Sequence, residues 1–529
     1  MRPNRAPAQS LSHHGSSPMR HPSLTRRGVV AVASLALAST AAIGGVAVAS
    51  TDAEPVSTPV TINTPDGQLM SYVVNARIAN PGQTRLVETA VKAAGGVVVQ
   101  SWPQIGVVIA HSKVSTFRAD VVAKGANAVD SVGATRTVAV SEGTPEVAGA
   151  SWGRGASGYK QGAKKDANGD LESDTSPALA SDPREADQWD MRMIKADQAH
   201  AITDGSRNVL VGVLDSGIDP DHPDLAANID VADSVNCTDA GRPDLSATGW
   251  YPTTSDHGTH VAGTIAAARN GVGIVGVAPN VRMAAVKVVN DAGFIYPEYA
   301  VCGFIWAGMK HMDVTNNSYY VDPFEFYCED QPDQYAAKEA VRRAVTWSTE
   351  QGVVHAAAAG NSARDLSDKS SFKDTTSPDD QPPAGFVTRT LNSGCEDIPT
   401  ELDGVVTVSS MQSVPTGSQT SRLSSFSNRG LGKIDVAAPG STILSTIVTN
   451  NGYGTKSGTS MASPHVAGVL ALMKSVHPTW TPAQMIDKLR AQADDKACGA
   501  ATGGPVCVGP VENNSFFGEG VVDALDAVS

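Results

Sequence analysis

Two long apolar runs limit what this chain can fold into. Residues 208–214 read NVLVGVL and residues 353–359 read VVHAAAA, without the polar alternation of a strand that has one face in water. Such runs are typical of strands buried on both faces of a parallel sheet. Helical stretches at 299–312 and 335–351 alternate with strands. The sequence therefore predicts an α/β domain whose parallel sheet is flanked by helices.

Polar residues stand where these runs end and where two small-residue helices begin. Asp215 follows the first run and Asn361 follows the second. His257 opens the segment HGTHVAGT, and Ser460 lies in GTSMASPHVAG, at the expected start of another helix. Ligands of open α/β sheets bind beyond the carboxyl ends of the strands, so these residues could face one crevice. A serine beside the unpaired N–H groups of a helix start suits a nucleophile that carries an oxyanion.

Each of these residues also has an ordinary structural explanation. Asp215 could form a turn at a strand end, and Asn361 could cap a helix. His257 could be a hydrogen-bonded histidine, and Ser460 a helix cap. Their joint occurrence favours a catalytic site over separate structural roles.

Three motifs in fixed order resemble the subtilisin-like serine proteases: DSGID from Asp215, HGTHVAGT from His257 and GTSMASPHVAG from Gly458. The order Asp, His, Ser is that of subtilisin. The likeness spans roughly residues 185–529 and implies a subtilisin-like catalytic domain. It also implies these roles: a triad of Asp215, His257 and Ser460, an oxyanion donor in Asn361, and substrate-binding residues Ser318, Tyr319 and Gly360. His260 and His465 lie inside the motifs but off the catalytic positions, so we interpret them as packing or hydrogen-bonding residues.

Two departures from the family pattern affect the substrate site. Ser318 is followed by Tyr319 and Tyr320, where family members usually carry a small residue and glycine. A long polar insertion, 362–395, comes directly after Asn361. It could border the cleft or form a solvated loop, and we favour the loop.

The resemblance also suggests a structural calcium ion, although the chemistry itself requires no cofactor. Subtilases often bind calcium through residues whose positions correspond here to Asp224 and Asn270, with Glu185 as a possible third ligand. Oxygen donors of this kind suit a hard cation. The alternative is a surface carboxylate and a loop asparagine that bind no ion.

The start of the chain and the cysteines indicate export. A basic region, an apolar stretch from Gly28 and an A-x-A site at residues 47–49 predict a signal peptide over 1–49, although a membrane anchor is an alternative. We therefore expect a secreted, extracellular protein that meets a membrane only during export. An even number of cysteines, six, favours disulfides. Six cysteines allow fifteen pairings. Cys498 and Cys507 could close a local loop, and the pairs Cys237 with Cys302 and Cys328 with Cys395 are then a guess for the remaining four.

Residues 50–140 predict a small α+β domain of βαββαβ order. Strands are expected at 71–76, 97–100, 106–110 and 135–140, and helices at 85–94 and 114–124. This ferredoxin-like pattern resembles the inhibitor-type propeptide of subtilases, which would be an intramolecular inhibitor and folding chaperone; an independent binding domain is the alternative. Residues 141–184 are rich in small and polar residues and predict a flexible linker. We expect an activating cut between 141 and 187, made by the enzyme itself, ahead of a catalytic domain at 185–529.

Charge and motif order narrow the choice of function. The net charge is −14 with no basic patch, so nucleic acid is not an expected partner. Protein or peptide substrates and a monomeric state are expected. The sequence predicts a secreted serine endopeptidase made as an autoprocessed precursor. One alternative is a non-catalytic binding protein that keeps the fold. The other is an ester-cleaving serine hydrolase, which usually has a G-x-S-x-G motif and the order Ser, Asp, His.

Overall fold

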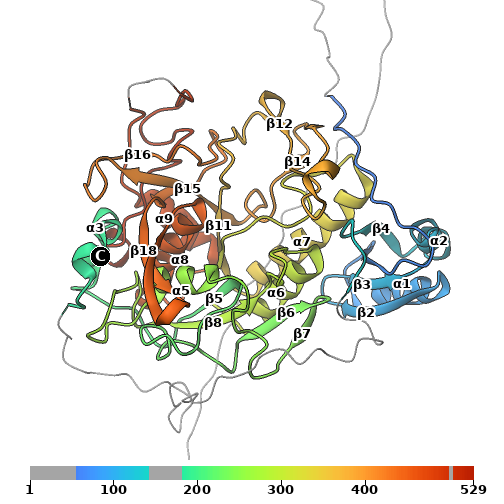
Figure 1. The fold of residues 1–529 in the computed structure, drawn as a ribbon, viewed down its shortest axis with the longest axis horizontal. Helices are drawn as coiled ribbons and strands as arrows, with labels where there is room; N and C mark the ends of the chain where they lie inside the picture. The colour runs from blue at the N-terminus through green and yellow to red at the C-terminus, as the bar shows by residue number, and fades with distance from the viewer. Residues whose placement is uncertain (1–54, 142–180, 500–503) are drawn as a thin grey trace, which may run out of the picture. The chain divides into compact units, whose positions relative to one another are not determined.

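The structure is a computed structural model that describes residues 55–141, 181–499 and 504–529 (Figure 1). The signal peptide expected at 1–49 and nearly all of the linker expected at 141–184 lie outside these residues. Within the described ranges, no helix combines the length and the apolar character needed to cross a bilayer.

The N-terminal part is a four-stranded antiparallel sheet in the order β2-β3-β1-β4, with two helices. Its elements are β1 (Met70–Ala76), α1 (Pro81–Ala93), β2 (Gly96–Trp102), β3 (Val107–Ser112), α2 (Phe117–Lys124) and β4 (Val129–Ala134). The last strand was expected at 135–140, and this position is wrong. Val132 and Ala134 carry the buried positions of β4, and the chain leaves the sheet after Ala134.

The larger part is built on a nine-stranded sheet in the order β16-β15-β11-β9-β5-β8-β6-β7, with β17 beside β15. The strands are β5 (Leu210–Asp215), β6 (Val235–Asp239), β7 (Arg242–Asp244), β8 (Arg282–Lys287), β9 (Val314–Asn317), β11 (Val354–Ala358), β15 (Val405–Ser413), β16 (Ser421–Leu423) and β17 (Val436–Pro439). The central pairs β8-β5, β5-β9, β9-β11 and β11-β15 are all parallel. The predicted parallel α/β architecture is therefore confirmed.

Helices cover both faces of this sheet. The helices are α3 (Trp189–Met193), α4 (Ala196–Ala199), α5 (His257–Ala266), α6 (Pro297–Met309), α7 (Pro332–Glu350), α8 (Thr459–Val476) and α9 (Pro482–Ala491). Leu210 and Leu214 of β5 share a core with α6 and α7, whereas Val211 and Val213 share one with α5 and α8. Because successive side chains of a strand point to opposite faces, one apolar run supplies both cores. Figure 1 shows α8 beside β11 and α5 beside β5.

The small sheet packs on α7 of the larger part. Val129 and Val132 of β4 lie in the same hydrophobic core as Ala336 and Val341 of α7. A Cβ on Gly133 would lie 2.7 Å from the backbone oxygen of Asp333, so only glycine permits this approach. The described residues from 55 to 141 are therefore in close contact with the larger part.

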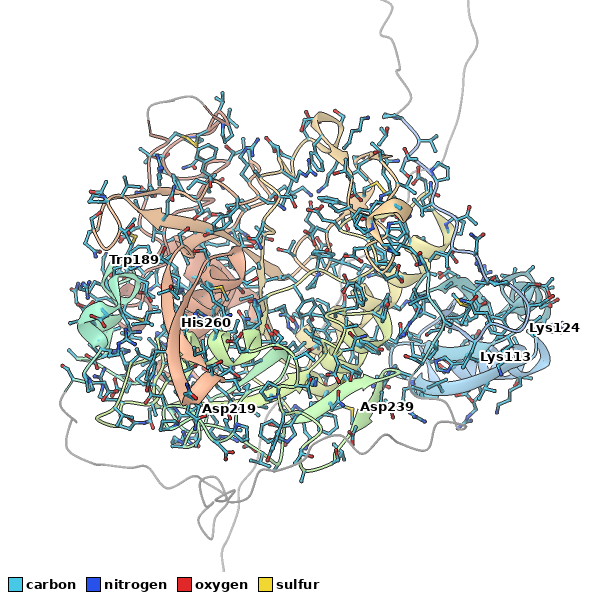
Figure 2. The ribbon with its side chains drawn as sticks, viewed as in Figure 1. Lys113, Lys124, Trp189, Asp219, Asp239 and His260 are labelled. Atoms are coloured by element: carbon cyan, nitrogen blue, oxygen red, sulfur yellow. A yellow bond between two sulfur atoms is a disulfide. The ribbon has the colours of Figure 1, made fainter. Side chains whose placement is uncertain are left out.

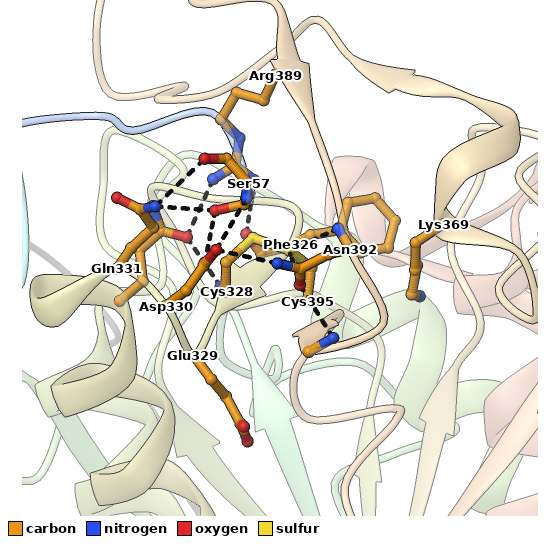
Figure 3. Close-up of a disulfide and its surroundings, with 12 residues drawn as sticks. Ser57, Phe326, Cys328, Glu329, Asp330, Gln331, Lys369, Arg389, Asn392 and Cys395 are labelled. Atoms are coloured by element: carbon orange, nitrogen blue, oxygen red, sulfur yellow. Dashed lines mark hydrogen bonds between the residues drawn. A yellow bond between two sulfur atoms is a disulfide. The ribbon is translucent and has the colours of Figure 1, made fainter. Parts of the chain in front are cut away.

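Short strands and disulfides complete the larger part. The remaining strands are β10 (Tyr327–Cys328), β12 (Lys373–Asp374), β13 (Arg389–Thr390), β14 (Cys395–Glu396), β18 (Ile443–Ile447) and β19 (Gly452–Lys456). The cysteines pair as Cys237–Cys302, Cys328–Cys395 and Cys498–Cys507. The second disulfide joins β10 to β14 at the end of the insertion (Figure 3).

The insertion 362–395 is not the solvated loop that we favoured. Its Leu366, Asp374, Arg389 and Leu391 are buried, and Arg389 forms an ion pair with Asp374 at 2.8 Å. Local hydrophobic residues and this buried ion pair fix the insertion against the domain.

Candidate active site

The carboxyl end of β5 meets the start of α5 at an aspartate and a histidine. Asp215 is the last residue of β5, and its side chain is 2% exposed. His257 opens α5 and is 31% exposed. Both carboxylate oxygens of Asp215 lie 3.0 Å from His257 Nδ1. This contact fixes the orientation of the imidazole and leaves its Nε2 edge to act on a substrate or a nucleophile.

The residues after each of these two side chains explain their close approach. A Cβ on Gly258 would lie 2.4 Å from the carbonyl oxygen of Gly217, so a larger residue cannot follow His257 here. Ser216 N–H donates to Asp215 Oδ1 at 2.7 Å, and Gly258 N–H donates to Ser216 Oγ at 3.0 Å. The short motifs around Asp215 and His257 therefore position the pair through backbone bonds as well as through the side chains.

Asp215 also raises the pKa of His257. Partial burial opposes protonation of the imidazole, but the adjacent carboxylate outweighs it by charge and by hydrogen bonding. The pKa of His257 is therefore raised from its ordinary value. An imidazole with this partner accepts a proton readily and is stabilised once charged.

Ser460 lies in the first turn of α8. The helix begins at Thr459 after an extended Gly458, so Ser460 N–H is one of the donors that a helix start leaves without an intrahelical partner. The Ser460 hydroxyl donates to the carbonyl of Ser318 at 3.3 Å. Ser318 Oγ in turn donates to the Ser460 carbonyl at 2.9 Å. These two bonds join the start of α8 to the segment after β9.

Asn361 lies beside the same helix start. Its Oδ1 accepts hydrogen bonds from Thr459 N–H (2.8 Å) and from Thr459 Oγ1 (2.9 Å). The amide is thereby oriented with Nδ2 free of these bonds and able to donate. Gly360 has φ +99°, and a Cβ there would lie 2.3 Å from Asn428 Nδ2, so the turn that presents Asn361 requires glycine.

A cavity of about 320 Å³ opens directly beside Ser460 and Asn361. Ser318, Tyr319 and Gly360, which the sequence suggested as substrate-binding residues, all line it. The lining residues are Gly293, Phe294, Ile295, Ser318, Tyr319, Tyr320, Asp322, Glu325, Ala358, Gly360, Asn361, Ser362, Asp379, Asp397, Thr459 and Ser460. The structure thus places the candidate nucleophile, the candidate oxyanion donor and the suggested substrate residues around one space.

The two other histidines of the motifs have structural contacts. His465 Nδ1 lies 2.8 Å from the Met461 carbonyl, and its Nε2 lies 3.1 Å from Asp190 Oδ2. His260, labelled in Figure 2, has Nε2 3.1 Å from the Ile443 carbonyl. Burial and the positive charges of its neighbours lower the pKa of His260 to about 4, so it stays neutral near pH 7.

Of the three residues suggested as calcium ligands, Asp224 and Asn270 lie close together, whereas Glu185 is paired elsewhere. Asp224 has a buried Oδ1 without a hydrogen-bond partner. However, Asn270 Nδ2 donates to the Pro223 carbonyl at 3.1 Å, and Glu185 forms an ion pair with Arg269. Among the described residues, no three His, Cys, Asp or Glu side chains are placed to hold one metal ion. The guanidinium of Arg269 thus already pairs with Glu185, the candidate third ligand.

Several residues of the site were not singled out from the sequence. Asn428 accepts Ser362 N–H at 3.2 Å and Arg364 N–H at 2.8 Å, and thereby holds the chain after Asn361. The segment SFSN that contains it was noted, but nothing in it indicated this role. The acidic lining of the cavity was also missed, because Asp322, Glu325 and Asp397 are far from the catalytic motifs in sequence.

A serine at the start of α8 and a histidine that a buried carboxylate orients at the start of α5, a helix packed on α8, are elements of a serine hydrolase site. Comparison with known sequences identifies the class more closely. The sequence model of the Subtilase family matches residues 206–518, and the chain belongs to this family. Subtilisin E from Bacillus subtilis is 36% identical over 305 residues, which is 58% of this chain and 65% of that protein. Subtilisin from Bacillus pumilus is also 36% identical over 305 residues, and here the match covers 90% of the relative.

Solved structures show the same fold. The epidermin leader peptide processing serine protease of Staphylococcus aureus has a TM-score of 0.59 at 20% identity, covering 87% of this chain and 98% of that chain. Fervidolysin from Fervidobacterium pennivorans, a keratinolytic enzyme, has a TM-score of 0.58 at 23% identity, covering 89% of this chain and 64% of that chain. At these identities the likeness supports the fold alone.

Proposed function

We propose that this protein is a secreted serine endopeptidase that hydrolyses peptide bonds of proteins through an acyl-enzyme on Ser460. The contact between both Asp215 oxygens and His257 Nδ1 carries the proposal, because it orients a base in a subtilase domain whose Ser460 opens a helix. Membership of the subtilase family supports the same reaction. The chemistry requires no metal or other cofactor.

The proposed reaction uses the side chains in sequence. His257 Nε2 accepts the proton of the Ser460 hydroxyl while Oγ attacks the scissile carbonyl carbon. Asn361 Nδ2 and the Ser460 backbone N–H donate to the resulting oxyanion. The oxyanion collapses, the C–N bond breaks, and His257 returns the proton to the leaving amine. Water then repeats the attack on the acyl-enzyme with His257 as base, which releases the acid and restores Ser460.

Residues 50–140 act in this proposal as a propeptide that inhibits and helps to fold the catalytic domain. The contacts of β4 with α7 support a domain that binds the protease directly. Arg118 pairs with Asp333 at 2.9 Å, and the buried Arg136 pairs with the buried Glu298. Cleavage between 141 and 187 by the enzyme itself would release it, and the mature enzyme would be a monomer. The three disulfides support a location outside the cell.

One experiment tests both the chemistry and the activation. The full-length precursor is expressed as wild type, as Ser460→Ala and as Ser457→Ala, an exposed serine that serves as the matched control. We expect wild type and Ser457→Ala to shorten with time and to react with a fluorophosphonate, while Ser460→Ala stays at full length and unlabelled. Wild-type protein that neither shortens nor labels would contradict the proposal and favour a non-catalytic binding protein. Labelled protein that cleaves esters but no peptides would favour the esterase alternative.

A further inference from the structure

The cavity beside Ser460 lies where a substrate side chain next to the scissile bond must go. Its walls include Asn361 and Ser460, the groups that would hold the attacked carbonyl, and Ser318, which is bonded to the backbone of Ser460. A side chain attached one carbon from that carbonyl can therefore enter the cavity. This residue is the one on the acyl side of the bond that is cut.

The cavity is lined by acidic side chains. Asp322, Glu325, Asp379 and Asp397 all contribute to it, and none of its lining residues is lysine, arginine or histidine. Two of these acids accept hydrogen bonds from other parts of the domain, and the Glu325 side chain interacts with Ser362. Asp322 Oδ2 accepts the N–H of Ile295, and Asp379 Oδ2 accepts the Tyr320 hydroxyl at 2.6 Å.

Asp397 has no such partner. Its side chain is buried, with 1% of the residue exposed, and its Oδ1 has no hydrogen-bond partner in the described structure. The Oδ2 atom faces the turn before Asn361, since a Cβ on Gly360 would lie 3.5 Å from it. A buried carboxylate without a donor is costly, and a cation with N–H groups would remove that cost.

Asp397 also has two negatively charged neighbours, Glu325 and Glu401. Burial raises the pKa of Asp397, and the negative charges of Glu325 and Glu401 raise it further. Burial likewise raises the pKa of Glu325, which is 5% exposed. Lys369 attracts Asp397, and Arg364 and Arg389 attract Glu325, but Lys369 is itself paired with Glu401 and Arg389 with Asp374. A positive group in the cavity would offset the repulsion among these acids and stabilise their charged forms, whereas a negative group would add to the repulsion.

We propose that this cavity selects arginine or lysine at the acyl side of the scissile bond, with Asp397 and Glu325 as the groups that bind its charge. The inference rests on the proposed endopeptidase function and specifies its substrate class. Tyr319 and Tyr320, which replace the small residues usual in the family, form walls along which the aliphatic part of such a side chain can pack. Arginine fits this role well, because its planar fork bonds carboxylates in two directions.

The test compares blocked peptide substrates that differ only in the residue before the scissile bond: arginine, its uncharged isostere citrulline, lysine, leucine and glutamate. Enzyme matured from the full-length chain is used, and kcat/KM is measured for each peptide. We expect arginine to exceed citrulline by about 10- to 100-fold, because hydrogen bonds to a charged group are worth more than neutral ones. Arginine and lysine should both exceed leucine, and glutamate should be the poorest substrate.

Three variants assign the selectivity to the cavity. Asp397→Asn and Glu325→Gln should each reduce the arginine-to-citrulline ratio by about tenfold. Asp403→Asn removes an exposed acid outside the cavity and should leave the ratio as in wild type.

If Asp397→Asn does not mature, Glu325→Gln still decides the question. A wild-type preference for leucine over arginine, or a ratio unchanged in Glu325→Gln and in any Asp397→Asn enzyme that matures, would overturn the proposal. If that enzyme is still labelled by a fluorophosphonate and cleaves the leucine peptide, only the proposed specificity is wrong. If it is neither labelled nor active on any peptide, the proposed endopeptidase function is wrong as well.

Discussion

The amide of Asn361 has two functions that substitutions can separate. Its Oδ1 holds the start of α8 through Thr459 N–H at 2.8 Å and Thr459 Oγ1 at 2.9 Å, while Nδ2 is available to the oxyanion. Asn361→Asp keeps oxygen acceptors for Thr459 and removes the donor. Asn361→Ala removes both. The pair of variants therefore distinguishes catalysis from local stability.

The two effects differ in size and in the quantity that reports them. Loss of the oxyanion-hole asparagine from subtilisin itself costs about 10²–10³ in kcat, roughly 2.7–4 kcal/mol. We expect a loss at least this large for Asn361→Asp, since its carboxylate also repels the oxyanion, with little change in KM. Asn361→Ala should show a similar loss in kcat. It should also lose about 1–3 kcal/mol in the free energy of unfolding, because two hydrogen bonds each contribute about 0.5–1.5 kcal/mol.

The assay uses mature enzyme throughout. Each precursor is matured with affinity-tagged wild-type enzyme, which is then removed, and kcat and KM are measured with one chromogenic peptide. The free energy of unfolding is obtained from denaturant titration. Asn208→Asp adds the same charge at an exposed position and serves as the control. If kcat of Asn361→Asp stays within about threefold of wild type, Asn361 is not the oxyanion donor and this part of the site is misassigned.

Three further predictions concern the pH profile, the loop suggested for calcium and the precursor. Asp215 raises the pKa of His257, and the base must be neutral, so kcat/KM should increase with pH with an apparent pKa above about 6.5. Asp215→Asn should move this increase to lower pH and reduce kcat by roughly 10⁴-fold. An increase that stays at the same pH in the variant would contradict the assignment. Chelator should leave the melting temperature unchanged, whereas Arg269→Met should lower it, because the Arg269 guanidinium supplies the positive charge beside Glu185. A lower melting temperature with chelator alone would show that a metal binds in this loop. In a precursor with an inactive nucleophile, Arg136→Leu leaves the buried Glu298 without its cation, although the Ser71 hydroxyl still donates to it. The free energy of unfolding in denaturant titration should fall by about 3–5 kcal/mol, whereas no change would mean that the pair is not buried as described.

The α/β architecture and the order of the catalytic motifs could be predicted from local stretches of sequence. Apolar runs that end in Asp215 and Asn361 have the periodicity of buried parallel strands, and this pattern does not depend on the rest of the chain. The cysteine pairs agree with the structure, but spacing indicated only Cys498 with Cys507, and the other two pairs were a guess among the three arrangements that four cysteines allow. The position of β4 was displaced by several residues, since Thr135 and Val138 continue the same β-branched pattern beyond the end of the sheet.

The substrate cavity could not be derived in this way. Its acidic lining comes from the segment after β9, from the insertion and from the residues before β15, and only the fold brings these together. The contacts of the suggested calcium ligands could not be derived from the sequence either. Counting along the motifs singled out Asp224 and Asn270, but it did not show that Arg269 would pair with Glu185.

The N-terminal segment is bonded to Asp330, beside the disulfide that ends the insertion (Figure 3), and to Thr390 of β13 within the insertion. Ser57 donates to Asp330 through its N–H at 2.8 Å and its hydroxyl at 2.6 Å, and Thr58 N–H donates to the Thr390 carbonyl at 2.9 Å. The proposed propeptide therefore also binds the insertion, which contributes Asp379 to the cavity. After cleavage beyond residue 141, the segment with Ser57 and Thr58 belongs to a separate polypeptide that only non-covalent bonds hold in place. Dissociation of that polypeptide would then free α7 and return the β13 edge of the insertion to water in one event, so amide exchange at Thr390 should accelerate together with the appearance of activity.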